Sequence, residues 1–282
     1  MKTSATFAAD WLSLREPADH AARSGLLAEH LKKVLKDRGF LRIVDLGCGH
    51  GSNLRWLAPR LTARQRWLLV DRDPDLLEIA RARSELHPPA AALEIETRRI
   101  DLADSTLDFL VDQDLVTASA LFDLVSGAWL RRLAHACRAH RLGALLALSV
   151  NGRWALLDSF GSDITDDDDR FVREQFNLHQ RRDKGLGAAL GPTAAELLPG
   201  IFGEHGFDVQ TQPSDWELPA GDALTRHLGR SLLQGWRNAA AEQAPEAQGR
   251  IEQWYNKRQR ALASGELGVR VGHVDVLALP AL

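Results

Sequence analysis

The first half of the chain alternates between helical and strand-like spacing of apolar residues. Apolar side chains that recur every three or four residues predict helices over 24–38, 53–61, 74–83 and 129–138. Shorter, mostly apolar runs predict strands over 41–46, 67–70, 93–100, 115–118 and 143–150. Because strand and helix alternate in this order, the pattern predicts an α/β fold, a doubly wound and mostly parallel sheet with right-handed crossovers.

The pattern changes after residue 150. Consecutive acids at 166–169 favour the start of a helix, and Thr193 with Glu196 has the spacing of a capping box. The rest predicts a strand over 207–212, mostly helical structure over 222–263 with a break near Pro245, and a last strand over 267–279. No linker or repeat separates these parts. We therefore expect one domain over 1–282, with an N-terminal helical segment (1–38), a ligand-binding core (39–150) and a second half (151–282) that carries a helical insert at about 221–264.

A glycine-rich loop joins the first predicted strand to a helix. Gly47, Gly49 and Gly51 allow a sharp turn and let a ligand approach the backbone closely. Ser52 stands where a dinucleotide fingerprint needs its third glycine, and no lysine follows as in a P-loop. What remains is an acid, Asp45, two residues before the first glycine. It suits a ligand that carries an ammonium group and no phosphate.

Two further acids follow the second and third predicted strands. Asp71 lies 20 residues after Gly51, at a strand end where an acid accepts hydrogen bonds from ribose hydroxyls. Asp101, followed by an apolar residue, suits the amino group and ring face of adenine. Asp73 stands before Pro74, and we interpret it as a helix cap.

Composition narrows the function classes. The hydrophobic share of 45% and the charged share of 26% are ordinary for a soluble protein, and the net charge of −3 argues against a nucleic-acid-binding protein. Cys48 and Cys137 have no metal-ligand spacing, so we expect no metal and a reducing, cytoplasmic location. Residues 1–7 do not look like a signal peptide, and no apolar run is long enough to span a membrane.

The loop and the acids together resemble the class I S-adenosylmethionine-dependent methyltransferase family over residues 40–150. The resemblance implies a seven-stranded sheet whose last strand, at 268–279, runs antiparallel. It also implies that S-adenosylmethionine is the cofactor. Its binding residues would come from the glycine loop and from the ends of the next three strands: Asp45, Gly47, Cys48, Gly49, Gly51, Asn53, Asp71, Arg72, Asp101, Leu102, Thr117, Ala118 and Ser119.

The acceptor side is predicted less sharply. Residues 114–126 match the family's fourth motif, which implies that Asp123 faces the substrate, or alternatively caps a helix or turn. The segments outside the core resemble a bacterial subgroup of small-molecule methyltransferases. From these segments we take His179 and His273, with Asp123, as candidate bases, and we take Trp11, His20, Arg181 and Trp216 as candidate substrate contacts. For the histidines a structural role is the alternative, and for Arg181 a solvated helix end.

The sequence therefore predicts an enzyme that moves a methyl group from S-adenosylmethionine to a nitrogen or oxygen of a small molecule. An RNA or protein methyltransferase is the alternative within the class, but it would need a basic groove. A non-catalytic cofactor-binding module is the alternative outside it, and Ser52 argues against a nicotinamide-dependent oxidoreductase.

Overall fold

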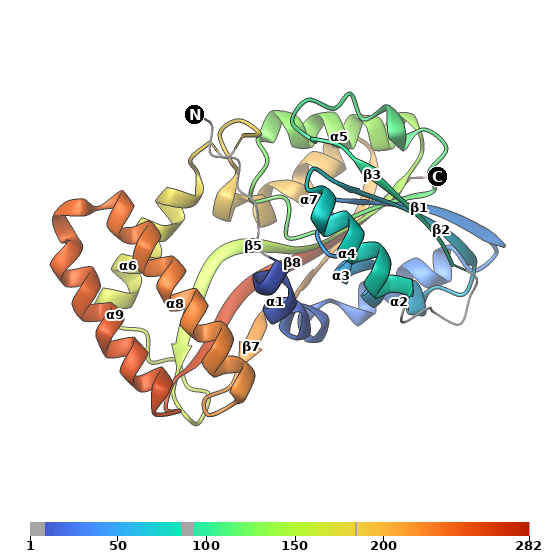
Figure 1. Cartoon of the computed structure of the whole chain (residues 1–282). Coiled ribbons are helices and arrows are strands. Elements are labelled where there is room, and N and C mark those ends of the chain that lie inside the picture. Colours follow the sequence, from blue (N-terminus) through green and yellow to red (C-terminus); the bar gives the residue numbers. More distant parts are fainter. Residues whose placement is uncertain (1–8, 86–92, 184, 282) are drawn as a thin grey trace.

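A central sheet organises the chain (Figure 1). The computed structural model describes residues 9–85, 93–183 and 185–281, so residues 1–7 and Lys184 lie outside the described part. The strands are β1 (Phe40–Leu46), β2 (Arg64–Asp71), β3 (Leu93–Arg99), β4 (Leu115–Ser119), β5 (Gly143–Leu157), β6 (Phe207–Pro213), β7 (Trp216–Leu218) and β8 (Gly268–Pro280). Their order is β3-β2-β1-β4-β5-β8-β6, and β7 also pairs with β8.

Strand direction confirms the predicted fold class. β1 to β5 pair in parallel, whereas β8 runs antiparallel to β5, β6 and β7. Two differences from the sequence prediction concern the strands beside β8. The three-residue β7 was not predicted, and β5 continues past residue 150 to Leu157 because β8 stays paired with it as far as Gly268.

Helices cover both faces of the sheet. They are α1 (Ala9–Ala22), α2 (Gly25–Val34), α3 (Ser52–Leu57), α4 (Pro74–Glu85), α5 (Gly127–Ala139), α6 (Asp167–Gln180), α7 (Ala194–Glu204), α8 (Ala223–Gln243) and α9 (Gln248–Ala263), with short 3₁₀ turns at Ala58–Arg60, Asp108–Leu110, Gly191–Thr193 and Pro245–Ala247. In β1, Ile43 packs with α2, α3 and α4, while the next residue, Val44, packs with α5 and α7. This alternation explains why the parallel strands are apolar on both faces.

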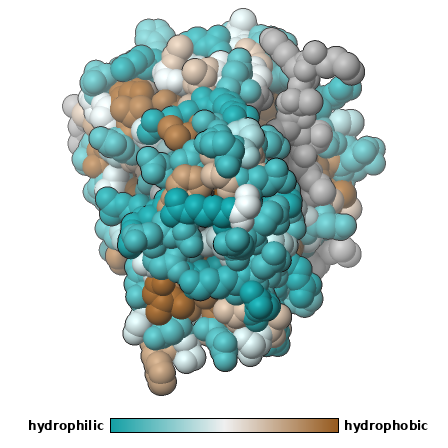
Figure 2. Space-filling view, turned by 90° about the vertical axis from the view of Figure 1, so that its left-hand side faces the viewer, coloured by the Kyte–Doolittle hydropathy of each residue, from teal (hydrophilic) through white to brown (hydrophobic). Residues whose placement is uncertain are grey.

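The helices on the two faces of the sheet form two hydrophobic cores with it. A third core lies where β5 and β8 extend beyond the other strands, beneath α6, α8 and α9 (Figure 1). Trp154 of β5 stacks on Trp236 of α8, with ring centroids 4.2 Å apart and planes within 4°. The outer face of this end of the molecule is mostly hydrophilic (Figure 2), as expected for helices that bury one stripe. The predicted helical insert therefore contains two helices, separated at Pro245.

Of the two helix starts predicted after residue 150, one is confirmed and the other is wrong. Asp166 caps α6 by accepting from the backbone N–H groups of Asp168 and Asp169, and the Asp169 side chain accepts from the N–H of Asp166. The capping box at Thr193 does not form. Its hydroxyl instead donates to the carbonyl of Leu190, because the preceding residues already form a 3₁₀ turn.

No helix among the described residues is long and apolar enough to cross a membrane.

Candidate functional site

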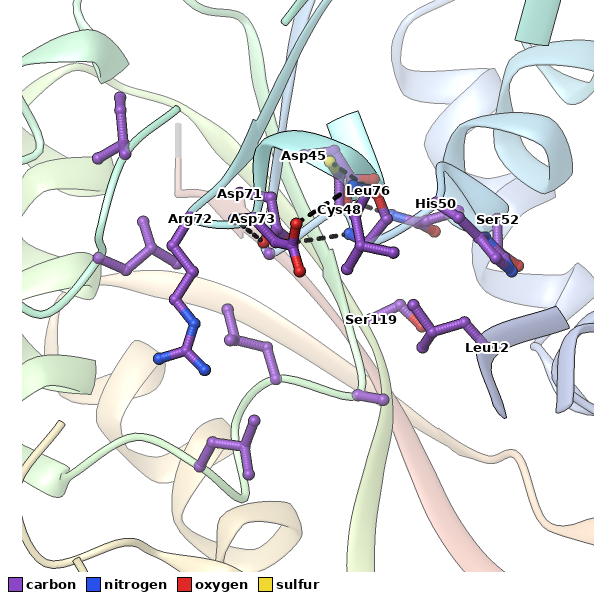
Figure 3. A pocket seen from close by; sticks show the side chains of 18 of the residues that line it. Leu12, Asp45, Cys48, His50, Ser52, Asp71, Arg72, Asp73, Leu76 and Ser119 are labelled. Carbon is purple, nitrogen blue, oxygen red and sulfur yellow. Dashed lines mark hydrogen bonds between the residues drawn. The ribbon is translucent and has the colours of Figure 1, made fainter. Parts of the chain in front are cut away.

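A cavity of about 400 Å³ opens at the carboxyl ends of β1, β2, β3 and β4 (Figure 3). Ligands of open α/β sheets bind at this edge. Most of the predicted cofactor residues line it: Asp45, Gly47, Cys48, Gly49, Asn53, Asp71, Arg72, Asp101, Leu102 and Ser119. The glycine loop and the strand-end acids thus meet at one cavity, as the sequence pattern required.

The glycine loop needs the conformation that glycine permits. Gly47, Gly49 and Gly51 have φ values of 60°, 52° and 83°, which side chains rarely adopt. A Cβ at Gly49 would lie 3.1 Å from Cδ1 of Leu12, and a Cβ at Gly47 would lie 3.2 Å from Cδ1 of Leu121. The loop is therefore tightly enclosed by neighbouring side chains as well as sharply turned.

Asp45 is a fully buried acid beneath this loop. Its Oδ1 accepts a 2.8 Å hydrogen bond from the Asn53 amide, while its Oδ2 has no partner among the described residues. Burial raises the pKa of Asp45 to about 7, against the opposing effects of Asn53 and of the Arg23 charge. A buried carboxylate oxygen without a partner is costly unless a ligand satisfies it. Asp45 therefore fits a ligand that brings a cationic donor such as an ammonium group.

Asp71 holds the loop from the end of β2. Its Oδ2 accepts from the backbone N–H of Gly49 at 2.9 Å, and its Oδ1 accepts from that of Asp73 at 3.0 Å (Figure 3). Each carboxylate oxygen can accept more than one hydrogen bond, so Asp71 keeps capacity for a ribose hydroxyl. Asp73 accepts from the N–H groups of Asp75 and Leu76, which is the helix-capping role predicted for it.

Asp101 and Leu102 form the wall that follows β3. One Asp101 oxygen accepts from the N–H of Ala103 at 2.9 Å, and the carboxylate is otherwise exposed at the cavity. Leu102 is almost fully buried beside it. A polar acceptor next to an apolar surface matches the edge and the face of a purine ring.

Three predicted cofactor residues do not line the cavity. Gly51 turns the chain into α3, and Ala118 is buried in the core of the sheet. Thr117 is also buried, where its hydroxyl donates to the carbonyl of Leu145 and accepts from the Asn53 amide. Thr117 and Asp45 therefore fix Asn53, which does line the cavity.

Helix α1 supplies a wall that the sequence analysis missed. Leu12, Arg15 and Asp19 of this helix line the cavity, and so does Arg23, which follows it. The signal was present in the spacing, because Arg15, Asp19 and Arg23 are four residues apart and share one helical face.

Arg23 is the most deeply buried cation of that wall. It is 5% exposed, and its guanidinium donates to Oδ1 of Asn53 and to the Ser119 hydroxyl. Burial lowers the pKa of Arg23, while the nearby Asp19, Asp275 and Asp45 carboxylates oppose the decrease. The Nε–H of Arg23 has no partner among the described residues. Arg23 fits an anionic group of a ligand lying between Asn53 and Ser119.

A buried ion cluster attaches α1 to the glycine-loop region. Glu16 accepts from the guanidinium groups of Arg55 on α3 and Arg83 on α4. The Nε2 of His50, a loop residue, lies 3.6 Å from Oε2 of Glu16. Burial alone would raise the pKa of Glu16, but Arg55, His50 and Arg83 outweigh it and hold the pKa below its usual value. The helix is thus fixed over the site.

The predicted acceptor-side residues do not line the cavity in the described part of the chain. His20 and Trp11 belong to α1, and the Nε2 of His20 lies 3.0 Å from the Ser52 hydroxyl. Trp216 and His273 pack against each other, with ring centroids 5.1 Å apart.

The other three predicted residues lie elsewhere. His179, near the end of α6, contacts Glu242 at the end of α8, and Arg181 caps α6. The carbonyl of Asp123 accepts from the N–H of Gly191. His179 and Arg182, on either side of Arg181, therefore join the end of α6 to the end of α8, since Arg182 also donates to the Glu242 carbonyl.

No group of three or more histidine, cysteine, aspartate or glutamate side chains in the described ranges could hold a metal ion.

Comparison with known proteins identifies the core. Residues 43–142 match a family model described as a methyltransferase domain. The chain carries a class I S-adenosylmethionine-dependent methyltransferase domain. The enzyme uses S-adenosylmethionine as its methyl donor. No functionally curated protein matches the sequence.

Solved structures of low identity resemble the methyltransferase along most of its length. The cyclopropane synthase MmaA2 of Mycobacterium tuberculosis is 12% identical, with a TM-score of 0.46 and coverage of 96% of this chain and 94% of that one. The YcgJ protein of Bacillus subtilis is 14% identical, with a TM-score of 0.49 and coverage of 91% and 98%. Phosphoethanolamine N-methyltransferase 2 of Haemonchus contortus, solved with phosphomonomethylethanolamine and S-adenosylhomocysteine, is 14% identical, with a TM-score of 0.44 and coverage of 96% and 57%.

Proposed function

We propose that this methyltransferase acts on a small-molecule acceptor and methylates a nitrogen or an oxygen atom. The observation that carries the proposal is the enclosure of the cavity. Helix α1 is fixed over the glycine loop by Glu16, and a Cβ at Gly49 would lie only 3.1 Å from Cδ1 of Leu12. A volume of about 400 Å³ lies in the range of small-ligand sites, which favours a small acceptor beside the cofactor.

The residues of the cavity fit S-adenosylmethionine part by part. Asp45 would receive the ammonium group and Arg23 the carboxylate, because each is a buried charge with an unsatisfied polar atom. Asp71 would accept from the ribose hydroxyls, and Asp101 with Leu102 would hold the adenine. When bound, the cofactor supplies a methyl group that is already activated by a sulfonium.

The protein's own contribution is then mainly alignment. Holding an acceptor at near-attack distance lowers much of the activation barrier for methyl transfer without further chemistry by the protein. The predicted bases Asp123, His179 and His273 lie outside the described cavity lining, so we assign none of them to proton removal.

The acceptor class is supported by charge as well as by enclosure. A polynucleotide-modifying enzyme usually presents a basic surface, whereas this chain has a net charge of −3. We also propose a cytoplasmic location, because Cys48 and Cys137 are both unpaired.

Calorimetry with S-adenosylhomocysteine, followed by turnover of labelled methyl donor on separated extract fractions, tests the proposal. We expect binding, and methyl transfer to the small-molecule fraction. Transfer confined to the RNA or protein fraction would contradict the acceptor class. Binding without transfer to any fraction would favour a non-catalytic module.

A further inference from the structure

Asp19 is a buried carboxylate on the cavity wall with no assigned partner in the cofactor. It is 5% exposed and lines the cavity from α1. Its Oδ1 accepts from the Arg15 guanidinium and, at 3.1 Å, from the indole N–H of Trp216. Within the described part of the chain, Oδ2 accepts only from Nε of Arg15, at 3.0 Å. Since a carboxylate oxygen has room for two hydrogen bonds, Oδ2 can accept one more.

The strand order places Asp19 on the acceptor side. The adenosine acids follow β2 and β3, the glycine loop follows β1, and Ser119 ends β4. The Trp216 that holds Asp19 belongs to β7, which pairs with β8 on the far side of β5. Asp19 therefore lies beyond the methionine end of the cofactor site, in the direction away from adenine.

Asp19, the single acid among the described residues of this wall, is already paired with one of its two arginines. Arg15 and Asp19 form an ion pair, and the Arg15 guanidinium lies 4.9 Å from the Trp216 ring centroid. Arg23 donates to the uncharged side chains of Asn53 and Ser119, and under the proposed function its charge meets the carboxylate of the cofactor. The cavity lining also has apolar side chains, among them Leu12 and Leu121. A charged acceptor would lose its hydration here without gaining a free counter-charge.

We propose, on the basis of the proposed function, that the acceptor is an electrically neutral molecule with an apolar body, held by a hydrogen bond from its nucleophilic O–H or N–H to Oδ2 of Asp19. Asp19 is the acceptor-binding residue. Trp216 is a positioning residue, because it acts on the acceptor through Asp19. Arg15 holds the carboxylate in place through its ion pair.

Ligand-observed NMR on the protein saturated with S-adenosylhomocysteine tests this with three probes of similar size: phenol, benzoate and benzylammonium. We expect phenol to bind at least about ten-fold more tightly than either charged probe. Asp19→Asn should weaken phenol binding by about ten-fold, since it removes a hydrogen bond to a charged group. Trp216→Phe, which keeps an aromatic ring but removes the indole N–H, should weaken phenol binding by a smaller factor.

Asp10→Asn is the matched control, because Asp10 is an exposed acid on the same helix and does not line the cavity. It should leave phenol binding unchanged. Affinity for S-adenosylhomocysteine should be unchanged in all three variants, which also shows that they fold. Equal phenol binding by Asp19→Asn, tighter binding of a charged probe, or no binding of any probe would overturn the inference. If the unaltered protein does not bind S-adenosylhomocysteine, that result would instead overturn the proposed function on which this inference rests.

Discussion

At the scale of single residues, the strand-end acids and the glycines serve the same loop. Asp71 was predicted from its position alone as a ribose ligand, and the structure adds a second task. Its carboxylate also accepts from the backbone N–H of Gly49. We therefore expect loss of this side chain to weaken cofactor binding both through the ribose contact and through the loop.

We expect Asp71→Ala to weaken binding of S-adenosylhomocysteine by about 1.5–3 kcal/mol, the range for hydrogen bonds to a charged group. Calorimetry measures this. Asp73→Ala is the comparison, because Asp73 caps α4 and its loss should affect stability more than affinity. Unchanged affinity in Asp71→Ala would refute the ribose assignment.

Gly49 gives a second residue-scale prediction. Gly49→Ala places a Cβ at 3.1 Å from Leu12 in a backbone with φ of 52°, so we expect a loss of at least about 1 kcal/mol in the free energy of unfolding and weaker cofactor binding. Gly39→Ala should change neither, since a Cβ there meets nothing within 4 Å. Urea unfolding measures the stability of the two variants, and calorimetry measures their affinity for the cofactor product. The same result for both variants would contradict the conclusion that Leu12 leaves no room for a Cβ at Gly49.

At the scale of elements, the acids that open α6 also join it to α9. Asp169 is fully buried, where it accepts from Nε of Arg258 at 2.9 Å and from the Trp254 indole. The sequence predicted a helix start from this acidic run but not an ion pair. The partners lie 85 and 89 residues further along the chain.

We expect Asp169→Asn to lower the free energy of unfolding by about 1.5–3 kcal/mol, because it removes the buried carboxylate that accepts from Arg258 and leaves the half-exposed Asp166 as its acidic partner among the described residues. Asp168→Asn is a matched control. The Asp168 carboxylate pairs with Arg250 at 2.7 Å, and both side chains are 46% exposed. We therefore expect this control to change the free energy of unfolding by less than about 1 kcal/mol. Urea unfolding at neutral pH measures both, and similar losses would show that the burial of Asp169 is unimportant.

At the scale of the whole molecule, acid should weaken the packing of α1 and β7 against β8. Burial lowers the pKa of His273 to about 4, and the Arg15 charge adds to the decrease. The folded chain keeps this imidazole neutral while the unfolded chain titrates near 6.5, so the unfolded chain binds more protons below that pH. His273 should therefore contribute a decrease on the order of 3 kcal/mol in the free energy of unfolding as the pH drops from 6.5 to about 4. The buried Asp45, whose pKa is raised to about 7, contributes in the opposite direction over this range, so the His273 component is isolated by comparing the chain with a variant.

His273→Gln should remove that component. Urea unfolding at about pH 7 and about pH 5 should show a smaller acid-induced loss in the variant than in the unaltered chain. An identical loss in both would mean that other groups carry the pH dependence. The pKa of Glu16 lies below its usual value, so its stabilising effect is lost only as the pH falls further, and it does not obscure the comparison.

The sequence alone was sufficient for the fold and for half of the site. The order of strands and helices follows from short-range periodicity, and the glycine loop with Asp45, Asp71 and Asp101 follows from positions at strand ends that parallel pairing must bring to one edge. Neither step needs knowledge of distant contacts.

Only the tertiary structure decided what closes the site. Asp19 meets Trp216 across 197 residues, and Glu16 meets Arg55 and Arg83 across 39 and 67 residues. Such pairings depend on how whole helices pack onto the sheet, and no local spacing specifies that. For the same reason the sequence did not place the predicted base His179 or the predicted substrate contact Arg181: His179 lies at the end of α6, Arg181 caps that helix, and neither lines the cavity.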